Sequence, residues 1–137
     1  SEHTFISNPT LTEHKSTMLF NVHHHWFDLD LDKPTANGFS DKIESDNLIG
    51  QSNYYQFYNT TLYHLDSVDF PSISTPIDIL YISTSEKIDI DNLLNAITPK
   101  TIVVGNNCNW QTRQALEKLS TENVHFLREK GAFIYKI

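Results

Sequence analysis

The chain has 137 residues, a length that suits one domain with a buried core and is too short for two ordinary domains. Its composition, 39% hydrophobic and 12% aromatic with 4 Gly and 5 Pro, excludes disordered and collagen-like classes. A net charge of −7 disfavours attraction of the whole molecule to nucleic acid or anionic lipid, although a local basic face is compatible with it. The single cysteine, Cys108, excludes an intrachain disulfide and a multi-cysteine zinc site. The chain opens at Ser1 without Met or a leader, so we expect a mature chain or a piece of a longer one.

The first 51 residues predict one strand and one long loop. Residues 17–31 mix aromatic and β-branched side chains, and apolar and acidic residues alternate from Phe27 to Asp32, which is typical of a strand with one face in water. Residues 33–51 combine Pro, Asn, Asp and Gly with few apolar side chains. Compact domains rarely carry so long a loop without a purpose, so we expect a mobile segment there.

Two apolar-aromatic runs, Tyr54–Tyr58 and Leu62–Leu65, predict a β-hairpin. They meet at Asn59 and Thr60, and Asn tolerates the positive φ that tight hairpin turns need. The aromatic residues of the first run could stack on nucleic-acid bases, although such runs more often form the core of a hairpin.

Residues 77–137 alternate between strand and helix. Buried-type strands are expected at 77–82, 101–104 and 124–127, and helices at 90–97 and 110–121. Asp89 and Asn109 are placed to cap the two helices, with Leu93, Leu94 and Ile97 on the core face of the first and Ala115, Leu116 and Leu119 on that of the second. A turn at Glu129–Gly131 leads into a last strand over 132–137.

This pattern predicts an α/β fold: a mixed sheet with a β-α-β-α-β core, parallel strands, right-handed crossovers and a terminal hairpin. We expect a single domain over residues 1–137, in which 1–51 form the N-terminal strand and loop and 52–137 form the hairpin and the α/β part. Ligands of such sheets bind beyond the carboxyl ends of the strands. The predicted strand ends carry a possible ligand rim of polar residues: Asp66, Ser83, Thr84, Ser85, Glu86, Asn106 and Asn107.

Charge is divided unevenly along the chain. Residues 1–71 carry 10 acidic and 3 basic side chains, whereas residues 72–137 carry 7 of each. A contact with DNA would therefore use the C-terminal half, and the candidates are Arg113, Lys118, Arg128 and Lys130.

Three features could carry metal or nucleophilic chemistry. On a strand, His23 and His25 share a face and could form half of a zinc or copper site, with Asp28 or Asp30 nearby; the pattern favours a polar strand face at a domain edge, because only two ligands are evident. The acidic run 28–32 could bind calcium, but it lacks the glycine and closing glutamate of an EF-hand loop, which favours a solvated face. Cys108 lies before a helix, where a thiol can be activated, yet no histidine is placed beside it.

The last sixty residues resemble the C-terminal end of ComEC-family competence proteins, polytopic membrane proteins implicated in DNA uptake. The shared features are the order of elements, a PK-x-[IV]-V-[IV] strand at Pro99–Val104, and the EKGAF close at Glu129–Phe133. Upstream, the hairpin that ends at Asp66 is similar to the family hairpin whose second strand ends on a substrate-side aspartate. The resemblance covers about residues 54–137 and is greatest to the shortened versions of the Bacteroidetes branch.

In fully equipped members this region resembles a metallo-β-lactamase-type hydrolase whose H-x-H-x-D-H motif holds two metals, and a nuclease activity has been proposed for it. Here Thr84 and Glu86 stand where the paired histidines would be, and no D-H follows. The resemblance therefore implies a degenerate, non-catalytic domain without a cofactor, which forms part of a metallo-β-lactamase-like sandwich.

The same resemblance implies an extramembranous domain of a bacterial inner-membrane protein, on the periplasmic side. Its partners would be the membrane-spanning part of the parent protein and DNA. One alternative is a metal-dependent hydrolase or nuclease with relocated ligands. Another is an α/β protein-interaction module unrelated to competence, whose partner docks on the acidic first half. In the hydrolase or nuclease alternative, the relocated metal ligands would be His64, Asp66, Glu86 and Asp89.

Overall fold

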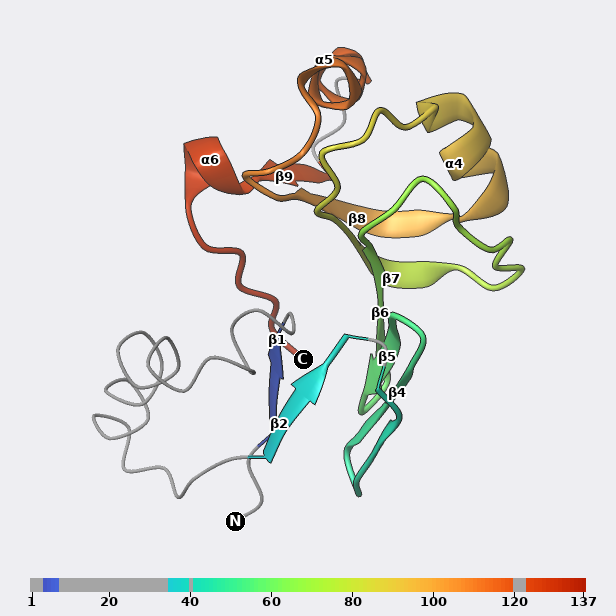
Figure 1. Cartoon of the computed structure of the whole chain (residues 1–137), viewed down its shortest axis with the longest axis vertical. Helices are drawn as coiled ribbons and strands as arrows, with labels where there is room; N and C mark the ends of the chain where they lie inside the picture. The colour runs from blue at the N-terminus through green and yellow to red at the C-terminus, as the bar shows by residue number, and fades with distance from the viewer. Residues whose placement is uncertain (1–3, 8–34, 40, 120–122) are drawn as a thin grey trace.

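The computed structural model describes residues 4–7, 35–39, 41–119 and 123–137. They form two sheets (Figure 1). The smaller pairs β1 (Thr4–Ser7) with β2 (Thr35–Gly38) in parallel. The larger has seven strands that follow one another in chain order: β3 (Ile43–Glu44), β4 (Leu48–Gln51), β5 (Tyr54–Phe57), β6 (Thr60–Leu65), β7 (Ile77–Ile82), β8 (Pro99–Val104) and β9 (Val124–Phe126).

The large sheet changes direction at β6. Strands β3 to β6 pair in antiparallel fashion, whereas β6 to β9 pair in parallel. This confirms the predicted mixed sheet of an α/β fold. The four parallel strands end at one edge of the sheet, and this arrangement positions the candidate site described below.

Two tight turns build the antiparallel half. Ser52 and Asn53 join β4 to β5 with φ of 52° and 67°, the positive values that a two-residue hairpin turn requires. The predicted hairpin of β5 and β6 is confirmed, but the residue with positive φ is Tyr58, at 51°, and not Asn59. Because Phe57 pairs with Thr60, Tyr58 takes the first central position of the turn, where the favoured hairpin turns demand positive φ.

The expectation of a long loop over 33–51 is wrong. This stretch contains β2, β3 and β4, and Ile43 is buried. The local sequence is rich in turn formers, but β5 offers a strand partner along its whole length, from Leu48 opposite Phe57 to Gln51 opposite Tyr54. Pairing within the sheet therefore overrides local propensity. The strand predicted at 17–31 lies outside the described residues.

Two capped helices cover one face of the parallel strands (Figure 1). Helix α4 (Ile90–Ala96) begins at Asp89, whose carboxylate accepts the backbone N–H of Asn92 at 3.1 Å. Helix α5 (Trp110–Lys118) begins at Asn109, whose side-chain oxygen accepts the N–H groups of Gln111 and Thr112. Both predicted caps are confirmed. The core between helices and sheet contains Tyr63, Leu65, Leu80, Ile82, Leu93, Ile97, Ile102, Val104, Leu116 and Phe126.

Leu119 does not join this core, contrary to the prediction. It follows the last residue of α5 as its C-cap and is 37% exposed. Its backbone is still helical, with φ of −66° and ψ of −16°, so it stays on the side of Ala115 and Ile88 but at the exposed end of the helix.

The predicted terminal hairpin is also wrong. Residues Leu127–Lys130 form the short helix α6, and residues 132–137 of the described chain run on without pairing to a strand. Gly131 ends α6: its N–H bonds to the carbonyl of Leu127 at 3.0 Å, and its φ of 74° is one that a side chain would disfavour. The tail then runs back toward β1 (Figure 1).

Candidate functional site

The predicted polar rim lies along one edge of the large sheet. Asp66 directly follows β6, Ser83 follows β7, and Asn106 and Asn107 come just after β8. The parallel ladder continues one residue into these loops, because Ser83 N–H bonds to the carbonyl of Leu65 and Gly105 N–H to that of Ile82. The fold therefore brings the residues that the sequence selected to a common edge.

Hydrogen bonds tie the two central loops of this edge to each other. The side-chain amide of Asn107 donates to the carbonyl of Ser83. Asn109 donates its backbone N–H to the carbonyl of Thr84 at 3.1 Å and its side-chain amide to the carbonyl of Ser85 at 3.1 Å. Asn109 thus caps α5 and holds the loop after β7 at the same time. The carbonyls of Ser83, Thr84 and Ser85 in that loop all accept hydrogen bonds.

Thr84 and Glu86, which the resemblance set in the place of the motif histidines, lie in the loop after β7. Thr84 is buried, and its hydroxyl accepts the backbone N–H of Glu86 at 3.1 Å. Glu86 is exposed to solvent. A threonine hydroxyl that bonds the backbone two residues on stabilises a turn. Thr84 therefore shapes the loop.

Thr112 forms a hydrogen bond with the far end of the loop that follows β7. It is 1% exposed, and its hydroxyl accepts the N–H of Ile88 at 2.9 Å. We expect Thr112→Val to lower the free energy of unfolding by about 1–3 kcal/mol, because it leaves a buried N–H without an acceptor. Urea unfolding measures this loss, and Thr112→Ser, which keeps the hydroxyl, should lose less. Equal losses for the two variants would contradict the assigned role of the hydroxyl.

The four candidate relocated ligands do not form a cluster. Asp66 accepts the side-chain amide of Asn53 at 2.8 Å, and Asp89 caps α4. His64 contacts the Ser83 hydroxyl, and Glu86 is exposed. Within the described ranges, no group of three or more His, Cys, Asp and Glu side chains could hold a metal ion. His23, His25 and Asp28 lie outside those ranges.

Cys108 does not have the environment of an activated thiol. Its side chain is half-buried, and this burial raises the pKa of the thiol despite the nearby Arg113. A thiol with a raised pKa holds its proton at neutral pH and is a poor nucleophile.

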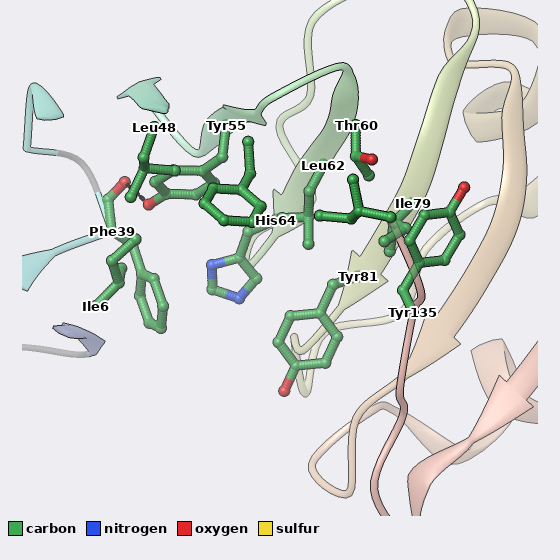
Figure 2. Close-up of a pocket in the computed structure, with 12 residues that line it drawn as sticks. Ile6, Phe39, Leu48, Tyr55, Thr60, Leu62, His64, Ile79, Tyr81 and Tyr135 are labelled. Atoms are coloured by element: carbon green, nitrogen blue, oxygen red, sulfur yellow. Dashed lines mark hydrogen bonds between the residues drawn. The ribbon is translucent and has the colours of Figure 1, made fainter. Parts of the chain in front are cut away.

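Sequence reasoning missed a second feature, an apolar pocket on the sheet face that α4 and α5 do not cover. Its volume is about 370 Å³, and Figure 2 shows side chains from β4 to β7 together with Phe39 and Tyr135 around it. Its walls include Phe39, Tyr55, Leu62, His64, Ile79 and Tyr81. The sequence carried one part of the signal: β6 and β7 have apolar or aromatic side chains on both faces, which is typical of strands buried on both sides.

His64 is the polar centre of this pocket. Its side chain is 2% exposed, and its ring lies 4.2 Å from that of Phe39, edge to face, and 5.0 Å from that of Tyr81, stacked. Its Nε2 is 2.5 Å from the hydroxyl oxygen of Ser83, while its Nδ1 has no hydrogen-bond partner in the described structure. Burial lowers the pKa of His64, an effect that Asp66 partly opposes. The imidazole is therefore neutral near pH 7.

This lowered pKa predicts a pH dependence of stability. The unfolded imidazole takes up its proton near pH 6.5, but the buried one does so only at lower pH. The contribution of neutral His64 is therefore complete above pH about 6.5 and is lost as the pH falls toward the folded pKa. We expect the urea midpoint to drop between pH about 7.5 and 5.5, and His64→Phe to flatten that drop. His125→Gln serves as the control, and an equal drop in the His64 variant would refute the prediction.

Comparison with known proteins decides the family. The family model described as the ComEC C-terminal domain matches residues 1–137. The chain belongs to this family. No curated protein and no solved structure matches it.

Membership confirms the resemblance and extends it from residues 54–137 to the whole chain. This ComEC C-terminal domain therefore belongs to a family of membrane proteins that act in competence and DNA uptake, so the alternative of a module unrelated to competence is wrong. No helix in the described part of the chain is long and apolar enough to cross a membrane.

The basic candidates for DNA contact lie on or beside α5 and α6 in this ComEC C-terminal domain. Arg113 is already engaged: its Nε lies 3.1 Å from a carboxylate oxygen of Glu117, it also pairs with Glu129, and its guanidinium lies over the ring of Phe126. Lys130 donates to the carbonyl of Val124 at 3.4 Å. The exposed side chains of Lys118 and Arg128 complete the set.

Proposed function

We propose that this domain is a non-catalytic, extramembranous part of a ComEC-family protein that serves DNA uptake by binding or scaffolding. The observation that supports the proposal lies at the carboxyl ends of the parallel strands, where the Thr84 hydroxyl is buried and bonds within its own loop and Glu86 is exposed.

The chemistry of the edge supports this proposal. A dinuclear hydrolase needs three or more nitrogen, sulfur or carboxylate ligands around each metal to activate water. Here the Ser83 carbonyl accepts from Asn107, the Thr84 hydroxyl from Glu86, and the Asp66 carboxylate from Asn53. These groups stabilise the loops of the edge instead of converging on a common point. We infer a degenerate metallo-β-lactamase-like region, of the shortened Bacteroidetes type, which keeps the architecture of the hydrolase but has no working metal site.

The membrane-spanning part of the parent protein is the partner that this role requires. Family membership supports that assignment, and we place the domain on the periplasmic side, where incoming DNA arrives. The acidic balance of the chain, −7, makes scaffolding a better fit than strong DNA binding by the whole surface.

Transformation of cells that carry the full-length parent protein tests the non-catalytic role. We expect Asp66→Asn and Glu86→Gln to leave the transformation frequency unchanged, because neither carboxylate performs chemistry. The core variant Leu80→Ala should lower the frequency, since it removes the folded scaffold. Loss of transformation in Glu86→Gln, with the protein present at its normal level, would overturn the proposal.

Within this role we propose that Lys118 and Arg128 supply whatever contact the domain makes with DNA, since Arg113 is neutralised by two glutamates. A mobility-shift titration at low salt should show weaker binding for Lys118→Gln/Arg128→Gln than for wild type. Lys118→Gln and Arg128→Gln are also tested singly against Lys42→Gln, which removes one charge far from α5 and α6, because Lys42 is exposed and precedes β3, the outer strand on the other side of the sheet from β9. Equal binding by the single variants and Lys42→Gln, or none by wild type, would refute the contact.

A further inference from the structure

The pocket on the sheet face that α4 and α5 leave uncovered is elongated and crosses the strands. Leu62 is in register with Tyr55 on β5 and with Ile79 on β7, so the floor of the pocket runs from strand to strand. The lining extends from Leu48 on β4 to Ile79 on β7, a distance of three strand spacings or about 14 Å. Figure 2 shows Leu48 and Ile79 on opposite sides of the close-up, with Leu62 between them.

The surface that this pocket offers to a ligand is almost wholly apolar. The Tyr55 hydroxyl already donates to the carbonyl of Phe39. His64 Nε2 contacts the Ser83 hydroxyl, and its Nδ1 is buried out of reach of the pocket. Water in such a space makes few hydrogen bonds, so its displacement by an apolar group is favourable.

These properties select the chemical class of a ligand. The volume of about 370 Å³ falls within the range of about 300–1,000 Å³ that small-molecule sites occupy. A ligand that fills this pocket must extend across several strands and bind without hydrogen bonds, and a hydrocarbon chain meets both conditions. A charged group would lose its hydration there without compensation.

We propose that the pocket binds one unbranched hydrocarbon chain of an amphiphile whose head group carries no net charge. The head group stays in water at the mouth, where Phe57, Tyr135 and Ile137 are exposed. An anionic head group is disfavoured because the chain has a net charge of −7. This site is separate from the strand edge of the proposed function and does not depend on it.

A chain-length series tests the proposal on the purified 137-residue chain. Octylphosphocholine and decylphosphocholine share a zwitterionic head group and are used below their micelle concentrations. We expect saturable one-to-one binding, with an affinity about fifteenfold higher for the decyl probe, because each buried methylene contributes about fourfold. Titration calorimetry measures affinity and stoichiometry. Absence of saturable binding, equal affinities for the two probes, or binding of phosphocholine without a chain would overturn the proposal.

Phe57→Asp and Ile49→Asp are a matched pair of variants. The two residues are 43% and 57% exposed and lie on the paired strands β5 and β4. Only Phe57 lines the pocket, because Leu48 is in register with it and the next residue, Ile49, points to the other face of the sheet. A carboxylate at position 57 should weaken binding of decylphosphocholine by about tenfold or more, whereas Ile49→Asp should bind as wild type does.

Circular dichroism and urea midpoints establish that both variants are folded. Equal affinities of the two folded variants would overturn the proposal. If Phe57→Asp does not fold, the chain-length series on the wild type still decides the matter, together with carbon-13 spectra in which decylphosphocholine should move the methyl signals of Leu62 and Ile79 but not those of Ile49.

Flotation with phosphatidylcholine vesicles identifies the source of the chain. A chain that leaves a bilayer for the pocket exchanges one apolar environment for another and gains little. We therefore expect the domain to bind the dissolved probes and not to float with vesicles. Flotation of wild type that is lost in Phe57→Asp and kept in Ile49→Asp would assign the chain to a bilayer lipid instead of a dissolved amphiphile.

Discussion

Replacing Leu80 with alanine is expected to lower the free energy of unfolding by about 2–5 kcal/mol. Leu80 lies in the middle of β7, is 0% exposed, and belongs to the core between the parallel strands and the two helices. The substitution removes buried apolar surface and leaves a cavity that rigid neighbours on both sides fill only partly. Urea or guanidinium unfolding followed by circular dichroism measures the loss.

Ile49 provides the matched control, because it is an aliphatic residue of the same sheet with 57% of its surface exposed. We expect Ile49→Ala to change stability by no more than about 0.5 kcal/mol. If both variants lose the same amount, the core does not lie between the parallel strands and helices α4 and α5.

Gly50→Ala is expected to destabilise the protein by about 1–3 kcal/mol and to distort the apolar pocket. A Cβ at position 50 would lie 2.4 Å from Cδ1 and 2.8 Å from Cε1 of Tyr55, the residue opposite it on β5. The Tyr55 ring is buried and its hydroxyl bonds to Phe39, so the ring has little freedom to move aside.

Gly38→Ala is the control for this substitution. The nearest atom to a Cβ there is a carboxylate oxygen of Asp41 at 3.3 Å, which accepts the Gly38 N–H at 2.7 Å but ends an exposed side chain and needs to give by only a few tenths of an ångström. We expect a change within about 0.5 kcal/mol. A Gly50 variant that unfolds at the same denaturant concentration as the Gly38 variant would show that Tyr55 is not fixed in the structure described.

The sequence was most informative where local signals and tertiary packing agree. Strands β7 and β8 and the helix caps Asp89 and Asn109 could be predicted, because an apolar run and a capping side chain are both readable within a few residues. The segment 33–51 could not, since its strands exist through pairing with partners outside a local window: β2 pairs with β1, and β4 pairs with β5 and carries β3. The tail after Gly131 was predicted wrongly because residues 127–130 form a short helix in place of a tight turn, so the chain leaves β9 without returning along it, although β9 is an outer strand of the described sheet.

One part of the candidate site could be predicted from the sequence, and the other part could not. The loops after β7 and β8 could be placed at one sheet edge from topology alone, because parallel strands share their carboxyl ends. The engagement of Asn107 and Asn109 with the preceding loop depends on side-chain geometry that sequence does not carry. The pocket around His64 depends on residues from β4 to β7 and on Phe39 and Tyr135, which no local pattern connects.

Cleavage of linear DNA tests the central claim most directly. The purified chain is incubated with single- and double-stranded DNA in the presence of Mn²⁺ or Zn²⁺, beside the Asp66→Ala variant. A domain whose strand edge has lost its metal ligands should leave both substrates intact with either ion. Cleavage by wild type that disappears in Asp66→Ala would show that a working metal site persists without the histidine motif, and would contradict the assignment of a non-catalytic role.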